Sequence, residues 1–180
     1  MNRSITILAV LAALAGNLTR SGMAGDMKHE HAAVAATSAL DPLKSLEGEW
    51  TGKAGTKGQE MQDATVIYRV TANGTVVMET LFSGTPHEMV TMYTADGNRI
   101  ALAHYCSMGN QPRMVSRARG ASNELAFEFV PTPGIDARKD MHMHGAKLTI
   151  VDPDHLRSEW TQFDKGKVAN VMMFEFARKK

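Results

Sequence analysis

The fold class of this chain follows from residues 62–106, which read QDATVIYRVTANGTVVMETLFSGTPHEMVTMYTADGNRIALAHYC. Apolar residues recur at every second position in short runs, which places them on one face of an extended strand because successive side chains of a strand point to opposite sides. The pairs Asn73-Gly74 and Asp96-Gly97 tolerate the positive φ that tight hairpin turns need. The stretch therefore predicts antiparallel strands connected by short hairpins.

The same pattern continues on both sides of this stretch, to the end of the chain. We predict ten strands, at residues 48–54, 62–71, 75–82, 87–94, 98–107, 113–119, 123–130, 146–151, 155–163 and 167–177. Strands that follow one another by hairpins leave two unpaired edges in an open sheet, and closure into a barrel removes both edges. The prediction is an all-β, antiparallel up-and-down β-barrel of about ten strands, with a flat sandwich as the alternative.

Composition and charge exclude several classes of function. The 180 residues suit one domain with one core, and the formal net charge of +1 shows no basic footprint for nucleic acid. The single cysteine, Cys106, excludes an intrachain disulfide and any site built from several cysteines. The 13 methionines include several at apolar strand positions, among them Met89. Flexible thioether side chains line an adaptable cavity well, although they fit equally in a plain core.

The N-terminus has the features of a signal peptide. A short positive region containing Arg3 precedes a mostly apolar run at residues 5–15, which is too short for a bilayer span of about 20 residues. Small residues allow cleavage after Ala15 or Ala24. We expect an exported protein, periplasmic or secreted, without a transmembrane segment. Its expected parts are a signal peptide (1–24), a flexible linker (25–40) and a barrel domain (41–180) that starts with a short helical turn at Asp41, the expected N-cap.

A short motif adds a family resemblance. Residues 46–52, Leu-Glu-Gly-Glu-Trp-Thr-Gly, open the first predicted strand, and Arg178 lies at the end of the last one. This arrangement resembles the calycin superfamily of lipocalins, fatty-acid-binding proteins and nitrobindin-like heme barrels, in which Gly-x-Trp opens the first strand. The resemblance implies that Trp50 and Arg178 close one end of the barrel, with the guanidinium stacked on the ring.

Other residues extend or limit this resemblance. Residues 84–114 are similar to uncharacterised exported bacterial proteins with lipocalin-like barrels, which brings no assigned activity. The longer nitrobindin-like motif is matched only at Gly48, Trp50 and Gly52. The last predicted strand contains no histidine, whereas those heme barrels carry their axial ligand there. The resemblance thus implies a barrel that holds a ligand in its lumen.

The first candidate site lies on the fifth predicted strand. His104 and Cys106 share one face of this strand, so both side chains line the lumen if its aliphatic face points inward. Imidazole and thiolate, with the thioether of Met108 nearby, suit copper, and each can ligate heme iron. The alternative is a buried cysteine beside a hydrogen-bonded histidine. In the loop that follows, Gln111 and Arg113 would bind a polar ligand group at the barrel mouth, or remain solvated.

Two tracts that mix histidine and methionine form a second candidate. The first covers residues 27–31, and the second covers Met141, His142, Met143 and His144 in the long predicted connection at 131–145. Thioethers and imidazoles suit copper in an exported protein, and long connections often serve as lids. Alternation within the second tract is equally consistent with two inward methionines and two solvated histidines.

Catalytic motifs are absent from the sequence. It contains no Gly-x-Ser-x-Gly, His-Glu-x-x-His, Cys-x-x-Cys or phosphate-loop pattern. We therefore predict an exported protein that binds a small hydrophobic or amphipathic molecule in the barrel lumen, with His104, Gln111 or Arg113 holding its polar group. Heme or copper binding is the alternative, and a cavity enzyme of unassigned reaction comes third. Ligand identity and oligomeric state do not follow from the sequence.

Overall fold

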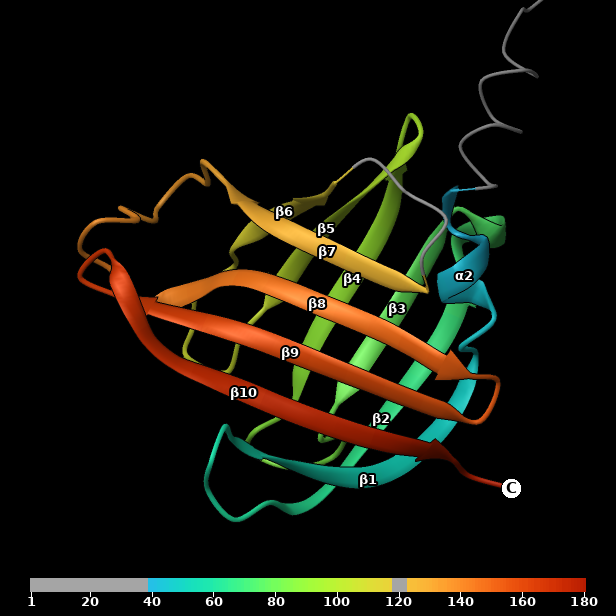
Figure 1. Ribbon diagram of the computed structural model, residues 1–180. Coiled ribbons are helices and arrows are strands. Elements are labelled where there is room, and N and C mark those ends of the chain that lie inside the picture. Colours follow the sequence, from blue (N-terminus) through green and yellow to red (C-terminus); the bar gives the residue numbers. More distant parts are fainter. Residues whose placement is uncertain (1–38, 118–122) are drawn as a thin grey trace, which may run out of the picture.

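Ten antiparallel strands follow one another around a closed barrel in the computed structural model (Figure 1). The structure describes residues 39–117 and 123–180. Its elements are α2 (Asp41–Lys44), β1 (Gly48–Thr56), β2 (Gln62–Thr71), η1 (Ala72–Gly74), β3 (Val76–Leu81), β4 (Met89–Asp96), β5 (Arg99–Tyr105), β6 (Arg113–Ser116), β7 (Glu124–Val130), β8 (His142–Asp152), β9 (His155–Asp164) and β10 (Lys167–Arg178). Each strand pairs with the next, and β1 pairs with β10, so the predicted up-and-down barrel is confirmed.

The N-terminal predictions fall mostly outside this description. The predicted signal peptide, residues 25–38 of the predicted linker and the tract at residues 27–31 lie outside the described residues. Leu40, which the sequence assigned to the end of the linker, is fully buried, so the folded part already includes it. Within the described part of the chain, no helix is long and apolar enough to cross a membrane.

Eight of the ten predicted strands match the observed strands to within two residues at both ends. The largest difference is at β8, which begins at His142 and not at the predicted residue 146. The register shifts between Met143 and Gly145, and such a bulge interrupts the alternation that marks a strand in the sequence. Residues 142–144 therefore belong to a strand, and the predicted lid connection is shorter than expected.

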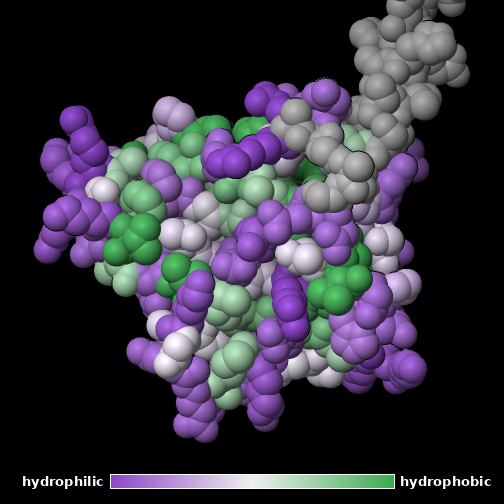
Figure 2. Space-filling view, in the orientation of Figure 1, coloured by the Kyte–Doolittle hydropathy of each residue, from purple (hydrophilic) through white to green (hydrophobic). Residues whose placement is uncertain are grey.

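Alternate residues of the strands fill the barrel interior. On β2, Val66 and Tyr68 are buried, and on β5 the same is true of Ile100, Leu102 and His104. The residues between these positions, Ile67 on β2 and Ala101 and Ala103 on β5, are partly exposed on the outer surface, where ion pairs also join neighbouring strands. Figure 2 shows one outer face of the barrel, which is largely hydrophilic with separate small hydrophobic areas. The alternation expected for a half-buried antiparallel sheet is thus present.

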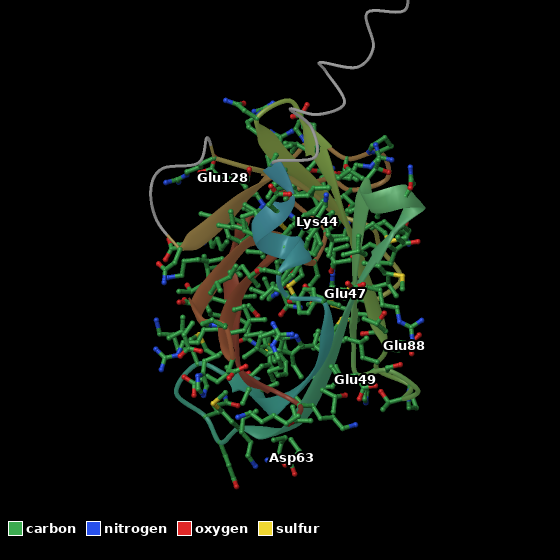
Figure 3. The ribbon with its side chains drawn as sticks, turned by 90° about the vertical axis from the view of Figure 1, so that its right-hand side faces the viewer. Lys44, Glu47, Glu49, Asp63, Glu88 and Glu128 are labelled. Atoms are coloured by element: carbon green, nitrogen blue, oxygen red, sulfur yellow. The ribbon has the colours of Figure 1, made fainter. Side chains whose placement is uncertain are left out.

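Helix α2 covers one end of the barrel. Its N-cap is Leu40, and Asp41 is already helical, so the N-cap predicted at Asp41 is wrong by one residue. Pro42 occupies the start of the helix, where its missing N–H has no cost. Leu43 and Leu46 are buried and extend the core toward this end. Figure 3 looks onto this end, with α2 lying across the opening.

The Trp50–Arg178 contact implied by the family resemblance is present at the same end. Trp50 is fully buried, and its Nε1 donates to the carbonyl oxygen of Leu46 at 2.8 Å. The Arg178 guanidinium lies over the indole, with Cζ 4.2 Å from the ring centroid. It also donates to the carbonyl oxygens of Glu47 and Ser45, each at 2.8 Å. Arg178 therefore joins the last strand to the segment between α2 and β1.

Gly52 allows the first and last strands to approach each other. Trp50 pairs with Arg178 and Gly52 with Phe176 across the β1–β10 ladder. A Cβ atom on Gly52 would lie only 1.9 Å from the carbonyl oxygen of Glu175, which a real side chain does not permit. The second glycine of the Gly-x-Trp-x-Gly motif is thus required by barrel closure.

We expect Arg178→Ala to lower the free energy of unfolding by about 2–3 kcal/mol, because it removes charged hydrogen bonds and the cation–π contact together. Arg178→Lys will recover only a small part of this loss, since an ammonium cannot reach both carbonyl oxygens as the planar guanidinium does. Urea unfolding of the full chain measures both variants.

Lys179→Ala is the matched control, because Lys179 forms an exposed ion pair with Glu49. Its expected loss is within about 0.5 kcal/mol. Equal stability of Arg178→Ala and Lys179→Ala would contradict the role given to Arg178.

Candidate functional site

A pocket of about 250 Å³ lies at the barrel end opposite α2. Its walls come from the inner faces of strands and from the connections that follow β3 and β5, and they are mainly apolar and sulfur-containing: Leu81, Phe82, Met89, His104, Cys106, Ser107, Met108, Met143, Trp160, Gln162, Asn170, Met172 and Phe174. Ser107 and Met108 are exposed at its rim, whereas His104 and Trp160 are buried at its inner end. The pocket is thus the open part of the lumen.

His104 is the polar group at the inner end of the pocket. Its side chain is buried, and its ring packs against Trp160 with 4.6 Å between the ring centroids. Nδ1 lies 2.9 Å from the hydroxyl oxygen of Thr91, but the buried Nε2 has no hydrogen-bond partner among the described residues. Burial lowers the pKa of His104 to about 4, so the ring is neutral at physiological pH.

Three further buried polar side chains hydrogen-bond one another inside the barrel. Tyr68 and Tyr93 both hydrogen-bond Oε2 of Glu79, at 2.9 and 2.7 Å. Burial, and then the charge of Glu79, raises the pKa of Tyr93. Burial likewise raises the pKa of Glu79, although the two phenols favour its ionised form. Thr91 thus contacts His104, and a separate hydrogen-bonded group joins Glu79 to the two tyrosines.

Sulfur atoms line the pocket wall, and polar side chains contact them. The thiol of Cys106 lies 3.9 Å from Sδ of Met89, and burial raises the pKa of this thiol. At the rim, the amide of Gln162 donates to Sδ of Met108 at 3.3 Å. The amide of Asn170 contacts both Sδ of Met172, at 3.6 Å, and the hydroxyl of Thr56, at 3.2 Å.

The structure places the predicted site residues in two groups. His104, Cys106 and Met89 come together in the pocket, as the alternation on β5 and β4 allows. Gln111 and Arg113 do not line it, and both are exposed. The Gln111 amide hydrogen-bonds within its own turn, and Arg113 alternates with the buried Met114 and so faces outward. The polar ligand contacts that we predicted for these two residues therefore have no support in the geometry.

The four side chains of the predicted tract at residues 141–144 do not meet at one site. Met143 lines the pocket, whereas Met141 is exposed. Nδ1 of His142 hydrogen-bonds the carbonyl oxygen of Asp140 at 2.7 Å, and its Nε2 lies 2.9 Å from Nδ1 of His144. These hydrogen bonds occupy three of the four ring nitrogens of the two histidines.

Aromatic rings hold the second histidine of this tract in place. The ring of His144 is stacked between Phe163, at 3.8 Å, and Phe129, at 5.1 Å. Partial burial, and then the charge of nearby His142, lowers the pKa of His144. Among the described residues, no group of three or more histidine, cysteine, aspartate or glutamate side chains is arranged to hold a metal ion. The packing therefore explains the histidine pair as a structural contact of β8 with aromatic rings of β7 and β9.

Several residues of the site were missed from the sequence. Thr91 faces His104 across the β4–β5 ladder, and Trp160 and Gln162 reach the same pocket from β9. Each of these residues lies on the inward face of a strand that was predicted correctly, so alternation was an available signal. Their meeting at one end of the lumen depends on barrel closure, which pairs β10 with β1 and so brings β9 and β4 to the same pocket.

Comparison with known proteins identifies the fold and leaves the activity open. A scan of protein-family models and a search of curated proteins found no match to this chain. A solved protein of unknown function from the DUF3598 family of Nostoc punctiforme PCC 73102 is similar, with a TM-score of 0.55, 13% identity and 76% of this chain covered. This chain spans 48% of that protein. Rv2717c from M. tuberculosis matches with a TM-score of 0.54 and 13% identity, over 79% of this chain and 98% of its own.

The burial of His104 predicts an acid-sensitive fold. The unfolded chain takes up a proton on this histidine below its ordinary pKa of 6.5, whereas the folded chain does so only near pH 4. Stability contributed by the neutral ring is thus present above pH 6.5 and is lost as the pH falls toward 4, by up to about 3 kcal/mol.

Urea unfolding at a series of pH values between 7 and 4.5 measures this effect. The variant His104→Gln should show a shallower loss of stability than the native chain over this range. His87→Gln, at an exposed loop position, is the control and should keep the native slope. Parallel curves for the native chain and His104→Gln would contradict this assignment.

Proposed function

We propose that this protein binds a small, largely apolar molecule in the pocket at the open end of its barrel, with one polar atom of that molecule on Nε2 of His104. The observation that carries the proposal is this buried nitrogen, which has no hydrogen-bond partner in the described part of the chain and borders the pocket. A buried polar atom without a partner costs about 1–3 kcal/mol, and a ligand that meets it removes that cost. Apolar burial against the methionine and aromatic walls supplies the rest of the affinity.

The volume of the pocket limits the size of the ligand. A cavity of about 150 Å³ accommodates benzene, so about 250 Å³ corresponds to roughly ten non-hydrogen atoms. A single aromatic or bicyclic molecule fits this volume. A porphyrin is several times larger, so heme does not fit the pocket in this conformation. The thioether side chains of Met89 and Met172 can repack around molecules of somewhat different shape.

Substitutions at two neighbouring methionines on β10 test this proposal. Met172 lines the pocket, whereas Met173 lies on the opposite face of the same strand, and both are half-buried. We expect the full chain to bind the bicyclic hydrocarbon indane with a Kd on the order of tens of micromolar. Met172→Trp should weaken this binding at least tenfold by filling the pocket, and Met173→Trp should not change it. Isothermal titration calorimetry measures all three proteins.

Two results would count against a lumen site. One is the absence of indane binding to the native chain, and the other is equal weakening by Met172→Trp and Met173→Trp. Native mass spectrometry of the purified chain complements the titration, because a small molecule retained from the expression host would appear as a mass adduct that Met172→Trp loses.

Copper(I) binding is a second candidate, favoured by one observation. Sγ of Cys106 and Sδ of Met89 are 3.9 Å apart beside the free nitrogen of His104. Two sulfurs at that separation fit a single metal with bonds of about 2.3 Å and a near-trigonal angle. Thiolate, thioether and imidazole are the soft ligands that copper(I) prefers.

Competition with a chromogenic copper(I) chelator tests this candidate. If these three residues bind copper, one equivalent will be retained by the native chain and lost in Cys106→Ser and in His104→Gln. The double variant His142→Gln/His144→Gln will retain it, since these imidazoles are occupied by each other. Retention by Cys106→Ser would exclude the site at Cys106.

Location and family are the remaining parts of the proposal. We propose export from the cytoplasm on the basis of residues 1–24, and a calycin-like relationship on the basis of the Gly-x-Trp motif and its partner Arg178. The similar solved structures support a barrel of this kind. Trp50 would then close the end beneath α2, and the ligand would enter at the opposite end.

A further inference from the structure

We propose that the connection between β5 and β6, residues 106–112, is a gate over the pocket, held closed by hydrogen bonds to β9 and to the residue before β8. This inference rests on the proposed function, because it concerns how a ligand enters and leaves the same pocket. The gate sets the rates at which a ligand exchanges, whereas the pocket walls set how tightly it is held.

The β5–β6 connection crosses the opening of the barrel. It leaves β5 and returns to the adjacent strand β6, yet Sδ of Met108 accepts a hydrogen bond from the amide of Gln162 on β9, at 3.3 Å. In the ring of ten strands, β9 is four places away from β5, which is almost the opposite side of the lumen (Figure 1). Cys106, Ser107 and Met108 line the pocket from this connection. A molecule that enters the pocket must therefore pass this connection.

Two side-chain hydrogen bonds, together called the latch, join the gate to the far wall. One is the contact of Gln162 with Met108, in which a thioether is a weak acceptor. In the other, Nδ2 of Asn110 donates to the carbonyl oxygen of Met141 at 2.7 Å. The backbone of the gate, by contrast, bonds to itself, from Gly109 to Cys106 at 2.9 Å and from Cys106 to Asn110 at 3.1 Å. The gate can thus move as one unit once the latch is broken.

The closed position leaves one atom of the latch unpaired. Oδ1 of Asn110 is buried and has no hydrogen-bond partner among the described residues. The orientation of this amide follows from its partner, because the carbonyl of Met141 can only accept and so must face the amide nitrogen. A buried oxygen without a partner raises the free energy of the closed position, and water satisfies it when the gate opens. The cost of this oxygen thus offsets the gain from the hydrogen bond, as a latch that must open requires.

The tip of the gate projects into open space. Gly109 has a φ of +87°, which glycine adopts without strain, and a Cβ atom there would meet no atom within 4 Å. Ser107 and Met108 beside it are exposed. Outward movement of the tip therefore separates no packed side chains, and the latch is the main resistance to it.

Cys106 provides a measurement of this movement that needs no ligand. It is the only cysteine of the chain, and it is 8% exposed at the base of the gate. The reaction of its thiol with 5,5′-dithiobis(2-nitrobenzoate) at pH 8 reports how often the pocket opens in the full chain. We expect this reaction to be roughly a hundredfold slower than in the urea-unfolded chain. Its rate should change little in dilute urea, because opening of one connection exposes little surface.

Asn110→Asp and Gln111→Glu form a matched pair, since each replaces an amide by a carboxylate in the same connection. Asn110→Asp places an oxygen against the carbonyl of Met141 and breaks the latch, so the thiol should react roughly tenfold faster or more. Gln111 is exposed and its amide hydrogen-bonds within its own turn, so Gln111→Glu should change the rate by less than about twofold. The equal change in charge cancels its effect on the anionic reagent.

Met108→Leu tests the other half of the latch. It removes the sulfur that accepts from Gln162 but keeps an apolar side chain of similar size, so a smaller acceleration of about threefold is expected. Urea unfolding of each variant shows whether the barrel itself has kept its stability.

Exchange of indane connects the gate to the proposed function. Trp160 lies in the pocket wall, so its fluorescence follows indane binding in stopped-flow mixing. Asn110→Asp should raise the association and dissociation rates together, each roughly tenfold, and should leave Kd within about threefold, because a gate changes the barrier and not the walls. Gln111→Glu should change neither rate.

The outcomes separate the gate from the pocket. Faster thiol reaction and faster indane exchange in Asn110→Asp, but not in Gln111→Glu, support the gate. Equal rates in these two variants, or a native thiol rate equal to that of the unfolded chain, overturn it and leave the pocket site intact. A native rate that rises with urea as steeply as global unfolding also overturns it. Absence of indane binding overturns the proposed function alone, because the thiol reaction measures the gate without a ligand.

Discussion

The rest of this structure depends on the pairing of β1 with β10, which converts a row of hairpins into a barrel with an interior. Gly52 permits this pairing because its missing side chain leaves room for the carbonyl of Glu175. Arg178 stabilises it from the other side by covering Trp50 and by binding the segment that leads from α2 into β1. Without closure, both edge strands would expose unpaired backbone groups, and no side chain would face an enclosed lumen.

A polar group inside an enclosed lumen must find its hydrogen-bond partners within the protein. Glu79, Tyr68, Tyr93 and Thr91 all face inward, and each one meets a partner within the barrel. Such networks are stable only when every member is satisfied, because the low dielectric raises the cost of an unpaired atom. Nε2 of His104, by contrast, is buried without a partner among the described residues, and that atom borders the pocket. The exception is therefore better explained by binding than by packing.

The ten strands could be predicted because a half-buried antiparallel strand leaves a period of two in the sequence. The prediction was least accurate at β8, where the register shift between Met143 and Gly145 breaks that period and two histidines pack against Phe129 and Phe163. Gln111 and Arg113 were predicted as ligand contacts because polar residues in a loop are typical of the open end of a ligand-binding barrel. Their actual direction depends on how the loop after β5 folds back onto β6, which no local pattern encodes.

The sequence by itself determined the fold class, the order of the strands, the inward position of His104 and Cys106, and the pairing of Trp50 with Arg178. These features depend on local alternation, turn residues and one short motif. Only the tertiary structure decided that Thr91 contacts Nδ1 of His104, that Glu79 joins Tyr68 and Tyr93, and that methionines from β4, β8 and β10 complete the pocket. The physical reason is that alternation states which face of a strand a side chain takes but not which partner it meets, and that the strands at the two ends of the barrel come together only through the β1–β10 pairing.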